Sequence, residues 1–227
     1  LKVGIYIFGI EFLAESGAST WLMWLAAFSI LAASVIAMTK DNLKARLAYS
    51  TISQLSYITL GVALASSMGI LGGGLHVVMH AMGKITLFMC DGSIYVATHR
   101  TEISQMTGLG RRMPITFIAF LIGALSIIGL PPLGGSWSKW LLMVGAVDAE
   151  HLFILGVLLV SSLLNVAYLL PLVAKGFFLS NDTDAELAQS AEASPLVWGP
   201  PAATAFGCVV LFFYAGHIQD FLMPIVA

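Results

Sequence analysis

Apolar runs long enough to cross a bilayer recur along the sequence, and they limit what this chain can fold into. A helix needs about 20 mainly apolar residues to cross the roughly 30 Å hydrocarbon core of a membrane. The chain is 59% hydrophobic and 10% charged, whereas an ordinary soluble domain carries about 25% charged residues. We therefore predict an all-α integral membrane protein, built as a polytopic helix bundle.

The spacing of the apolar runs predicts about six full transmembrane helices after a partial one. Residues 1–14 are too short for a span and are typical of the end of a preceding helix. The full segments are expected at 21–38, 47–65, 70–98, 114–147, 152–178 and 197–214. Residues 180–195 form an acidic loop. Residues 196–227 are expected to form a C-terminal transmembrane helix and a tail at or near a membrane surface.

Basic residues collect in two of the short connections. The loop after segment 21–38 and the loop after segment 70–98 contain Lys40, Lys44, Arg46, Arg100, Arg111 and Arg112. Short loops rich in Lys and Arg remain on the cytoplasmic side of the membrane. Both loops are therefore predicted to face the cytoplasm, and the hairpins between them the opposite side.

Segment 114–147 is too long to be one straight span. Its 34 residues would extend about 50 Å as an unbroken helix. The stretch "GLPPLGG" interrupts it with Pro131, Pro132, Gly134 and Gly135. Proline removes a backbone donor and glycine relaxes the dihedral limits, so the helix is expected to break there. Within a membrane the freed backbone groups need protein or a wet cavity beside them.

Lys139 follows this break within "GGSWSKWLL". It lies between Trp137 and Trp140, and Asp148 is the next acidic residue along the chain. One hypothesis places its ammonium in the wet interior near the break. The alternative is that the side chain reaches the membrane surface beside the two tryptophans.

A polar row follows one face of segment 70–98. His76, His80 and Lys84 are successive i, i+4 neighbours, and Asp91 returns to nearly the same face two turns later. Ionisable residues inside a membrane usually face the bundle interior or water. The four residues are therefore expected to form one inward stripe.

Three interpretations of the stripe compete. Paired histidines can bind a metal, but "HVVMH" lacks the glutamate of HExxH and no third ligand has a diagnostic spacing, so we expect neither a metal nor a cofactor. The row can also be a structural hydrogen-bond network between helices. Proton or ion conduction is the favoured interpretation because histidine titrates near neutral pH.

Segment 47–65 adds polar groups at helical spacing. Ser50, Ser53 or Gln54, Tyr57 and Gly61 fall on one face. Their hydroxyl and amide groups can hold ordered water along a wet interior. They can equally be small and hydrogen-bonding residues that pack one helix against another.

Three motifs in this order resemble one family. They are "KDNLKARLAYSTISQLSYI", "HVVMHAMGKITLFMCDGSI" and "GLGRRMPITFIAFLIGALSIIGLPPLGGSWSKW". Together they resemble the antiporter-like membrane subunits shared by respiratory complex I and the Mrp-type multisubunit cation/proton antiporters. The form "IIGLPPLGGSWSKW" is most similar to the Mrp-type D subunit.

The resemblance implies a fold and roles for particular residues. The family has two inverted five-helix repeats, and residues 20–179 would form one of them, with the broken helix at 114–147. Lys139 would be the terminal proton-transfer lysine. Ser138, next to it in the sequence, is a candidate supporting residue. Lys84 would be the central lysine, with His76 and His80 as its relay partners. Asp91 departs from the family pattern, and its pairing with Lys84 would add a site or slow the proton.

The implied function is that of a proton-translocating subunit of a multisubunit monovalent cation (Na⁺)/H⁺ antiporter. The alternative is a proton-pumping subunit of a complex I-like NADH:quinone oxidoreductase or a membrane-bound hydrogenase. A third class is a scaffold without transport. No redox chemistry or nucleic-acid binding is expected of this chain. The expected partners are the lipid bilayer of the bacterial inner (plasma) membrane and other membrane subunits. Either one of these subunits supplies the family's first repeat, or this chain is a fragment of a longer protein.

Overall fold

The computed structural model describes residues 17–179 and 191–225. The partial helix predicted at 1–14 lies outside the described residues, as does most of the acidic loop predicted at 180–195. The main helices are α2 (Ala18–Thr39), α3 (Leu43–Ala63), α4 (Ser67–Thr98), α5 (Pro114–Ile128), α6 (Gly135–Asp148), α7 (Leu152–Phe178) and α9 (Pro195–Leu222). Short 3₁₀ turns η2 (Ile103–Met106), η3 (Leu109–Arg111) and η4 (Met223–Ile225) complete the described elements. Among them α2, α4, α7 and α9 are long and apolar enough to span a membrane. The predicted helical membrane bundle is confirmed.

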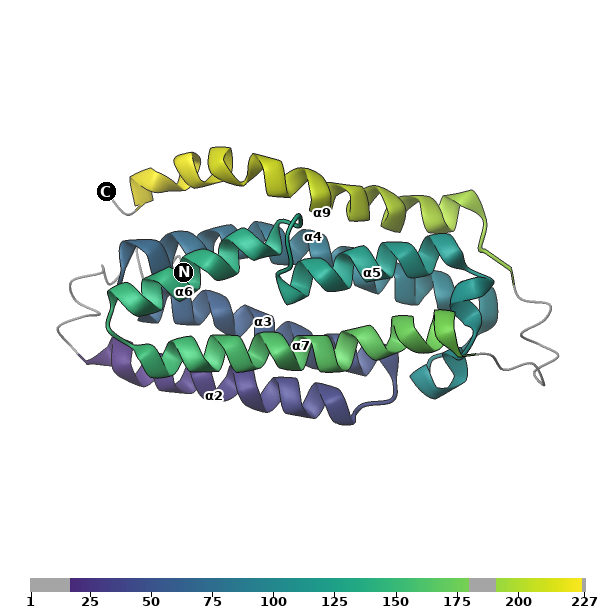
Figure 1. Cartoon of the computed structure of the whole chain (residues 1–227), viewed down its shortest axis with the longest axis horizontal. Helices are drawn as coiled ribbons and strands as arrows, with labels where there is room; N and C mark the ends of the chain where they lie inside the picture. Colours follow the sequence, from purple (N-terminus) through teal and green to yellow (C-terminus); the bar gives the residue numbers. More distant parts are fainter. Residues whose placement is uncertain (1–16, 180–190, 226–227) are drawn as a thin grey trace.

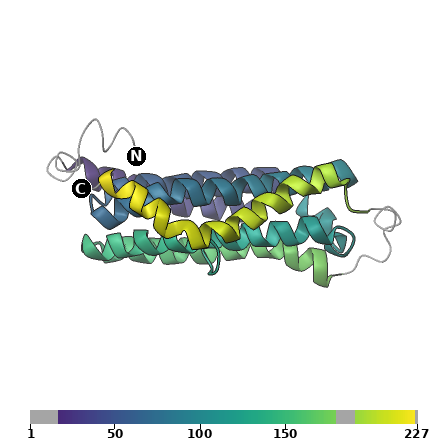
Figure 2. The same ribbon diagram turned by 90° about the horizontal axis from the view of Figure 1, so that it is seen from above.

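Helix α4 occupies the centre of the bundle. It packs against α3, α5, α6 and α9, and the helices run along one common direction (Figures 1 and 2). Within its most apolar window, 72% of α4 is buried, compared with 17% of α9 at the periphery. A polar side chain on α4 is therefore surrounded by protein on most sides.

Segment 114–147 is broken as predicted. Helix α5 ends at Ile128, and Gly129 follows with a φ of 92°, a conformation that favours glycine. After the connecting loop, α6 continues in nearly the same line (Figure 1). The loop is held from outside because the Gly134 N–H donates to the Cys208 carbonyl of α9 at 3.1 Å. The break lies near mid-length of the bundle (Figure 1).

The two basic loops meet at one end of the molecule. The Leu43 N–H donates to the Thr101 carbonyl, and the Ile103 N–H donates to the Asp41 carbonyl, each at 2.9 Å. The Asn42 amide also donates to the Glu102 carboxylate at 3.2 Å. We call this contact the loop clasp. It brings the basic residues of both loops to one end, as the predicted orientation requires.

Two helices extend four or more residues beyond their predicted boundaries. Helix α3 begins at Leu43 rather than at residue 47, because the Asn42 side chain accepts from the Ala45 N–H and caps an earlier first turn. Helix α9 continues to Leu222, beyond residue 214. Polar His217 and Asp220 are exposed, so they continue the helix on its outer face instead of ending it. The predicted surface tail is therefore largely helical.

Candidate functional site

Three polar side chains of α4 lie inside the bundle. His76, His80 and Lys84 are each 6% exposed or less, whereas Val77 and Val78 on the other face are exposed. Their i, i+4 spacing keeps them on the face that contacts α3 and α6. The structure therefore brings these three predicted residues together in the protein interior.

The Lys84 ammonium points toward α3. It donates to the Leu47 carbonyl at 3.1 Å and to Ser50 Oγ at 2.7 Å. The expected pairing with Asp91 is not formed, because Asp91 lies seven residues after Lys84, about 10 Å along the helix, and Lys84 bonds to α3 instead. Asp91 is half-buried and interacts electrostatically with Lys44 instead. It does not belong to the inward stripe.

Helix α7 supplies polar residues that the sequence analysis missed. Ser50 Oγ lies 2.8 Å from Tyr168 Oη, and the Tyr168 hydroxyl donates to Asn165 Oδ1. Asn165 Oδ1 also accepts from Gln54 Nε2 at 3.3 Å. The available signal was the spacing of Ser161, Asn165 and Tyr168, which places three polar residues on one face of a very apolar helix. These contacts connect Lys84 to α7.

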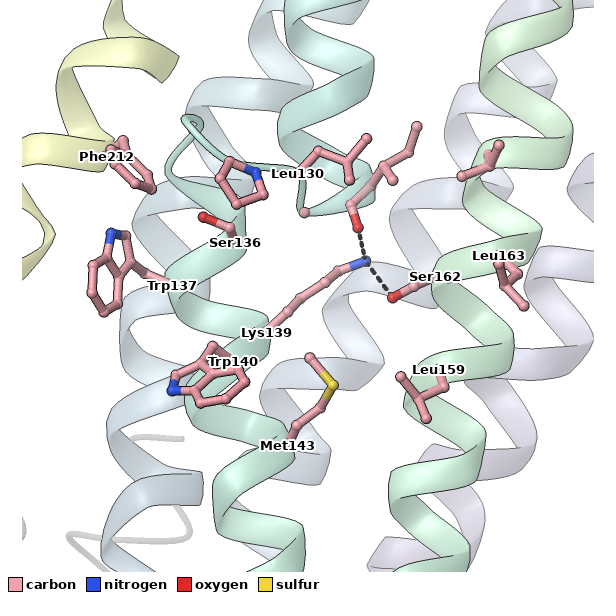
Figure 3. Close-up of a pocket in the computed structure, with 14 residues that line it drawn as sticks. Leu130, Ser136, Trp137, Lys139, Trp140, Met143, Leu159, Ser162, Leu163 and Phe212 are labelled. Carbon is pink, nitrogen blue, oxygen red and sulfur yellow. Dashed lines mark hydrogen bonds between the residues drawn. The ribbon is translucent and has the colours of Figure 1, made fainter.

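Lys139 lies in the first turns of α6 and is 4% exposed. Its Nζ donates to the Ile128 carbonyl at 3.0 Å and to Ser162 Oγ at 3.2 Å (Figure 3). It also lies 5.0 Å from the centre of the Tyr57 ring. The alternative in which Lys139 reaches the surface is wrong, because the ammonium finds acceptors at the break.

The helix break explains why an ammonium is stable at this position. The last carbonyls of a helix have no partner within it, and they carry the negative end of the helix dipole. Ile128 is the last residue of α5, so its carbonyl is such an acceptor. Breaking the helix thus creates a cation-binding helix end in the interior, and Lys139 from α6 occupies it.

Stacked rings connect the surroundings of Lys139 to the α4 stripe. The Tyr57 and His76 rings are 5.3 Å apart and nearly parallel, and the His76 and His80 rings are 5.8 Å apart. Nδ1 of His76 lies 2.9 Å from Ser138 Oγ, and that hydroxyl also donates to the Gly135 carbonyl. Ser138 therefore ties the orientation of the His76 ring to the backbone of the break.

Several buried polar atoms along this row have no hydrogen-bond partner among the described residues. They include Nε2 of His76, Nε2 of His80, Oε1 of Gln54 and Nδ2 of Asn165. Buried polar groups are nearly always satisfied by protein or by ordered water. A polar row of this kind suits internal water, which typically makes about three hydrogen bonds to such groups. The arrangement can hold water between titratable side chains.

Ser53 lies outside this network. Its hydroxyl is 2.9 Å from Ser34 Oγ and donates to the Ile30 carbonyl at 3.0 Å. It therefore stabilises the contact between α2 and α3, which was the alternative interpretation of this helix face. Within residues 17–179 and 191–225, no group of three or more His, Cys, Asp or Glu side chains is arranged to hold a metal ion.

Relatives with known names match most of this chain. It is 38% identical over 156 residues to NADH-quinone oxidoreductase subunit N of Desulforudis audaxviator, a match that covers 69% of this chain and 31% of the relative. It is 30% identical over 200 residues to NADH-quinone oxidoreductase subunit L of Rickettsia bellii, covering 88% of this chain and 30% of the relative. The chain thus spans about a third of the length of these curated relatives.

Solved structures share the fold. A chain of respiratory complex I from Thermus thermophilus with bound NADH superimposes with a TM-score of 0.86 at 25% identity, over 99% of this chain and 48% of that one. A chain of the Mrp complex from Dietzia sp. DQ12-45-1b gives a TM-score of 0.81 at 23% identity, over 93% of this chain and 48% of that one. The family model described as "NADH:quinone oxidoreductase/Mrp antiporter, TM" matches residues 1–165. With its buried polar row and broken helix, the chain belongs to the NADH:quinone oxidoreductase/Mrp antiporter transmembrane family.

Proposed function

We propose that this chain is a membrane subunit that translocates protons through the bundle interior. The observation that carries the proposal is the placement of two buried lysines, Lys84 and Lys139, at either side of the polar row that contains His76 and His80. Buried ionisable groups within a membrane are expensive, and they commonly mark ion pathways. All four side chains can gain or lose a proton.

The contacts support two lines of polar groups that start at Lys84. One runs from Lys84 along α4 through His80 and His76 toward Ser138 and Lys139. Water completes it, because Nε2 of each histidine has no partner among the described residues. The other passes through Ser50, which receives a hydrogen bond from Lys84 and contacts Tyr168 of α7. Hydroxyl groups both donate and accept, so they can pass a proton along such a line.

Two assemblies fit a proton-translocating subunit. The names of the relatives, NADH-quinone oxidoreductase subunits N and L, favour a redox-driven pump of the complex I type. The stretch "IIGLPPLGGSWSKW" favours a monovalent cation (Na⁺)/H⁺ antiporter of the Mrp type. In either assembly, other membrane subunits adjoin this chain.

The proposal is tested in vesicles that contain the native assembly with Lys84→Ala or Lys139→Ala. Each change removes a buried proton carrier, so the initial rate of pH change is expected to fall about tenfold or more, ~1.4 kcal/mol in the barrier. The control is Lys44→Ala, which removes an exposed lysine at the end of the bundle. Unchanged rates for both buried-lysine variants in an active assembly would overturn the proposal.

The same vesicles distinguish the two assemblies. NADH with a quinone drives the pH change in a complex I-like pump, and a sodium gradient drives it in an antiporter. Each driving force is applied separately to the unmodified assembly. The driving force that produces a pH change identifies the assembly, and the other assembly type is then rejected.

A further inference from the structure

An open pocket of about 880 Å³ lies between α6, α7 and the loop at the helix break (Figure 3). Its size falls within the range of about 300 to 1,000 Å³ that is usual for small-molecule sites. Exposed apolar side chains form its mouth, among them Trp140, Leu159 and Leu163. Of the described residues that line it, Lys139 alone is charged.

The pocket opens at the depth of the hydrocarbon core. Ser162 is ten residues after the start of α7 and Lys139 nine residues before the end of α6, which puts both about 14 to 15 Å inward from the helix ends. A phospholipid headgroup remains at the membrane surface. A ligand that reaches Lys139 from this side is therefore an apolar chain with a small polar head.

Lys139 and Ser162, at the inner end of the pocket, determine which polar head group the ligand can carry. An ammonium has three N–H donors, and Lys139 uses two of them, toward the Ile128 carbonyl and Ser162 Oγ. The third donor and the positive charge suit a carboxylate, since charge-assisted hydrogen bonds are the strong ones. A neutral carboxylic acid can arrive through the lipid and transfer its O–H proton to the neutral amine of Lys139. The products are a carboxylate and an ammonium, and no net charge has entered the membrane.

We propose that this lateral pocket binds a long-chain fatty acid, with its carboxylate at Lys139 and Ser162. The acyl chain lies along the apolar mouth beside Trp140 and Leu163. The consequence for transport rests on the proposed function: a carboxylate paired with Lys139 withdraws that lysine from proton transfer. A bound fatty acid therefore inhibits the subunit.

The test uses the native assembly in lipid nanodiscs and a palmitic acid that carries a photoreactive diazirine in its chain. After illumination, mass spectrometry is expected to find the label on peptides of α6 and α7 that line the pocket. Oleic acid is expected to compete for the label, whereas oleyl alcohol, which has the same chain without the carboxylate, is not. Equal competition by the alcohol would overturn the carboxylate recognition. Absence of label on these peptides would overturn the proposed site. This outcome includes the case in which another subunit of the assembly covers the pocket.

Variants separate the head of the ligand from its chain. Lys139→Gln is expected to weaken labelling about tenfold or more, because it removes a charge-assisted hydrogen bond. Leu163→Trp keeps the lysine but enlarges a side chain at the mouth, so it is also expected to reduce labelling. Lys84→Gln is the matched control, since it removes a buried lysine that does not line the pocket. If labelling does not depend on Lys139 while Lys139→Ala abolishes transport, the fatty acid proposal fails and the proposed function stands.

Discussion

Ser50 joins two polar lines in the described part of the bundle. Its hydroxyl accepts from Lys84 of α4 at 2.7 Å and contacts Tyr168 of α7 at 2.8 Å. A hydroxyl has one donor and two acceptor positions, so it can serve both neighbours at once. The polar row on α4 is therefore not isolated, and α7 is expected to influence proton movement.

Replacing Tyr168 with Phe tests the connection through α7. The change removes the hydroxyl between Ser50 and Asn165 while keeping the ring, and the lost hydrogen bonds are expected to cost about 1 kcal/mol of stability. The initial rate of pH change in vesicles is expected to fall about tenfold, which corresponds to ~1.4 kcal/mol. Tyr95→Phe is the control because Tyr95 of α4 is half exposed. A full rate in Tyr168→Phe would show that protons bypass α7.

The sequence located the α4 residues but not their partners on α7. His76, His80 and Lys84 stand out because charged and polar residues in one apolar run share one face. Ser161, Asn165 and Tyr168 also share a face of α7, but they are uncharged, and uncharged polar residues are common as packing contacts between membrane helices. Which helix faces Lys84 depends on the packing of the whole bundle, and one sequence does not contain that information directly.

At the scale of elements, the break between α5 and α6 depends on close backbone packing. A Cβ atom on Gly135 would lie 1.9 Å from the Ser126 carbonyl oxygen. That oxygen belongs to the backbone, so it cannot rotate away as a side chain does. The prolines and glycines of "GLPPLGG" predicted the break, whereas the contact that makes Gly135 necessary is visible only in the fold.

Gly135→Ala is expected to destabilise the protein by about 1 to 3 kcal/mol, the usual cost of overpacking an interior. The measurement is the thermal unfolding midpoint in detergent. Gly156→Ala on α7 is the matched control, because a Cβ there would meet nothing within 4 Å and alanine favours the helix by about 0.5 to 1 kcal/mol. An equal midpoint for both variants would show that the break accommodates a side chain.

Helix boundaries were the less predictable part of the elements. Asn42 starts α3 early through its cap, and exposed polar residues continue α9 beyond the apolar run. Both departures share one cause: the apolar pattern reports where a helix is buried in lipid or protein, not where its hydrogen bonds end. The apolar runs therefore underestimated both helices.

At the scale of the whole molecule, the loop clasp holds the basic residues of both loops at the same end of the helix bundle. Backbone hydrogen bonds join residues 41–43 to residues 101–103, so the loops after α2 and α4 lie on one side of the membrane. Their Lys and Arg content predicts the cytoplasmic side. The hairpin that contains His151 then lies on the opposite side.

Accessibility of engineered cysteines tests this orientation. In a background without Cys90 and Cys208, which are both buried, exposed positions Gln105 and His151 are replaced by Cys one at a time. A membrane-impermeant maleimide added to intact cells is expected to label His151→Cys. Gln105→Cys is expected to react only after the cells are opened. The reverse pattern would invert the assigned orientation.

The hydrogen bond from Lys139 to the Ile128 carbonyl joins two properties in one contact. The ammonium is the proposed proton carrier, and it also ends α5 by satisfying its last carbonyl. Its hydrogen bond is strongest when the nitrogen is charged, so each proton that leaves loosens the junction between the half-helices. Such linkage is reciprocal. Any movement that pulls α5 away from α6 therefore changes the free energy of proton binding to Lys139 by the same amount. Movement of the two half-helices is thereby coupled to the proton affinity of Lys139.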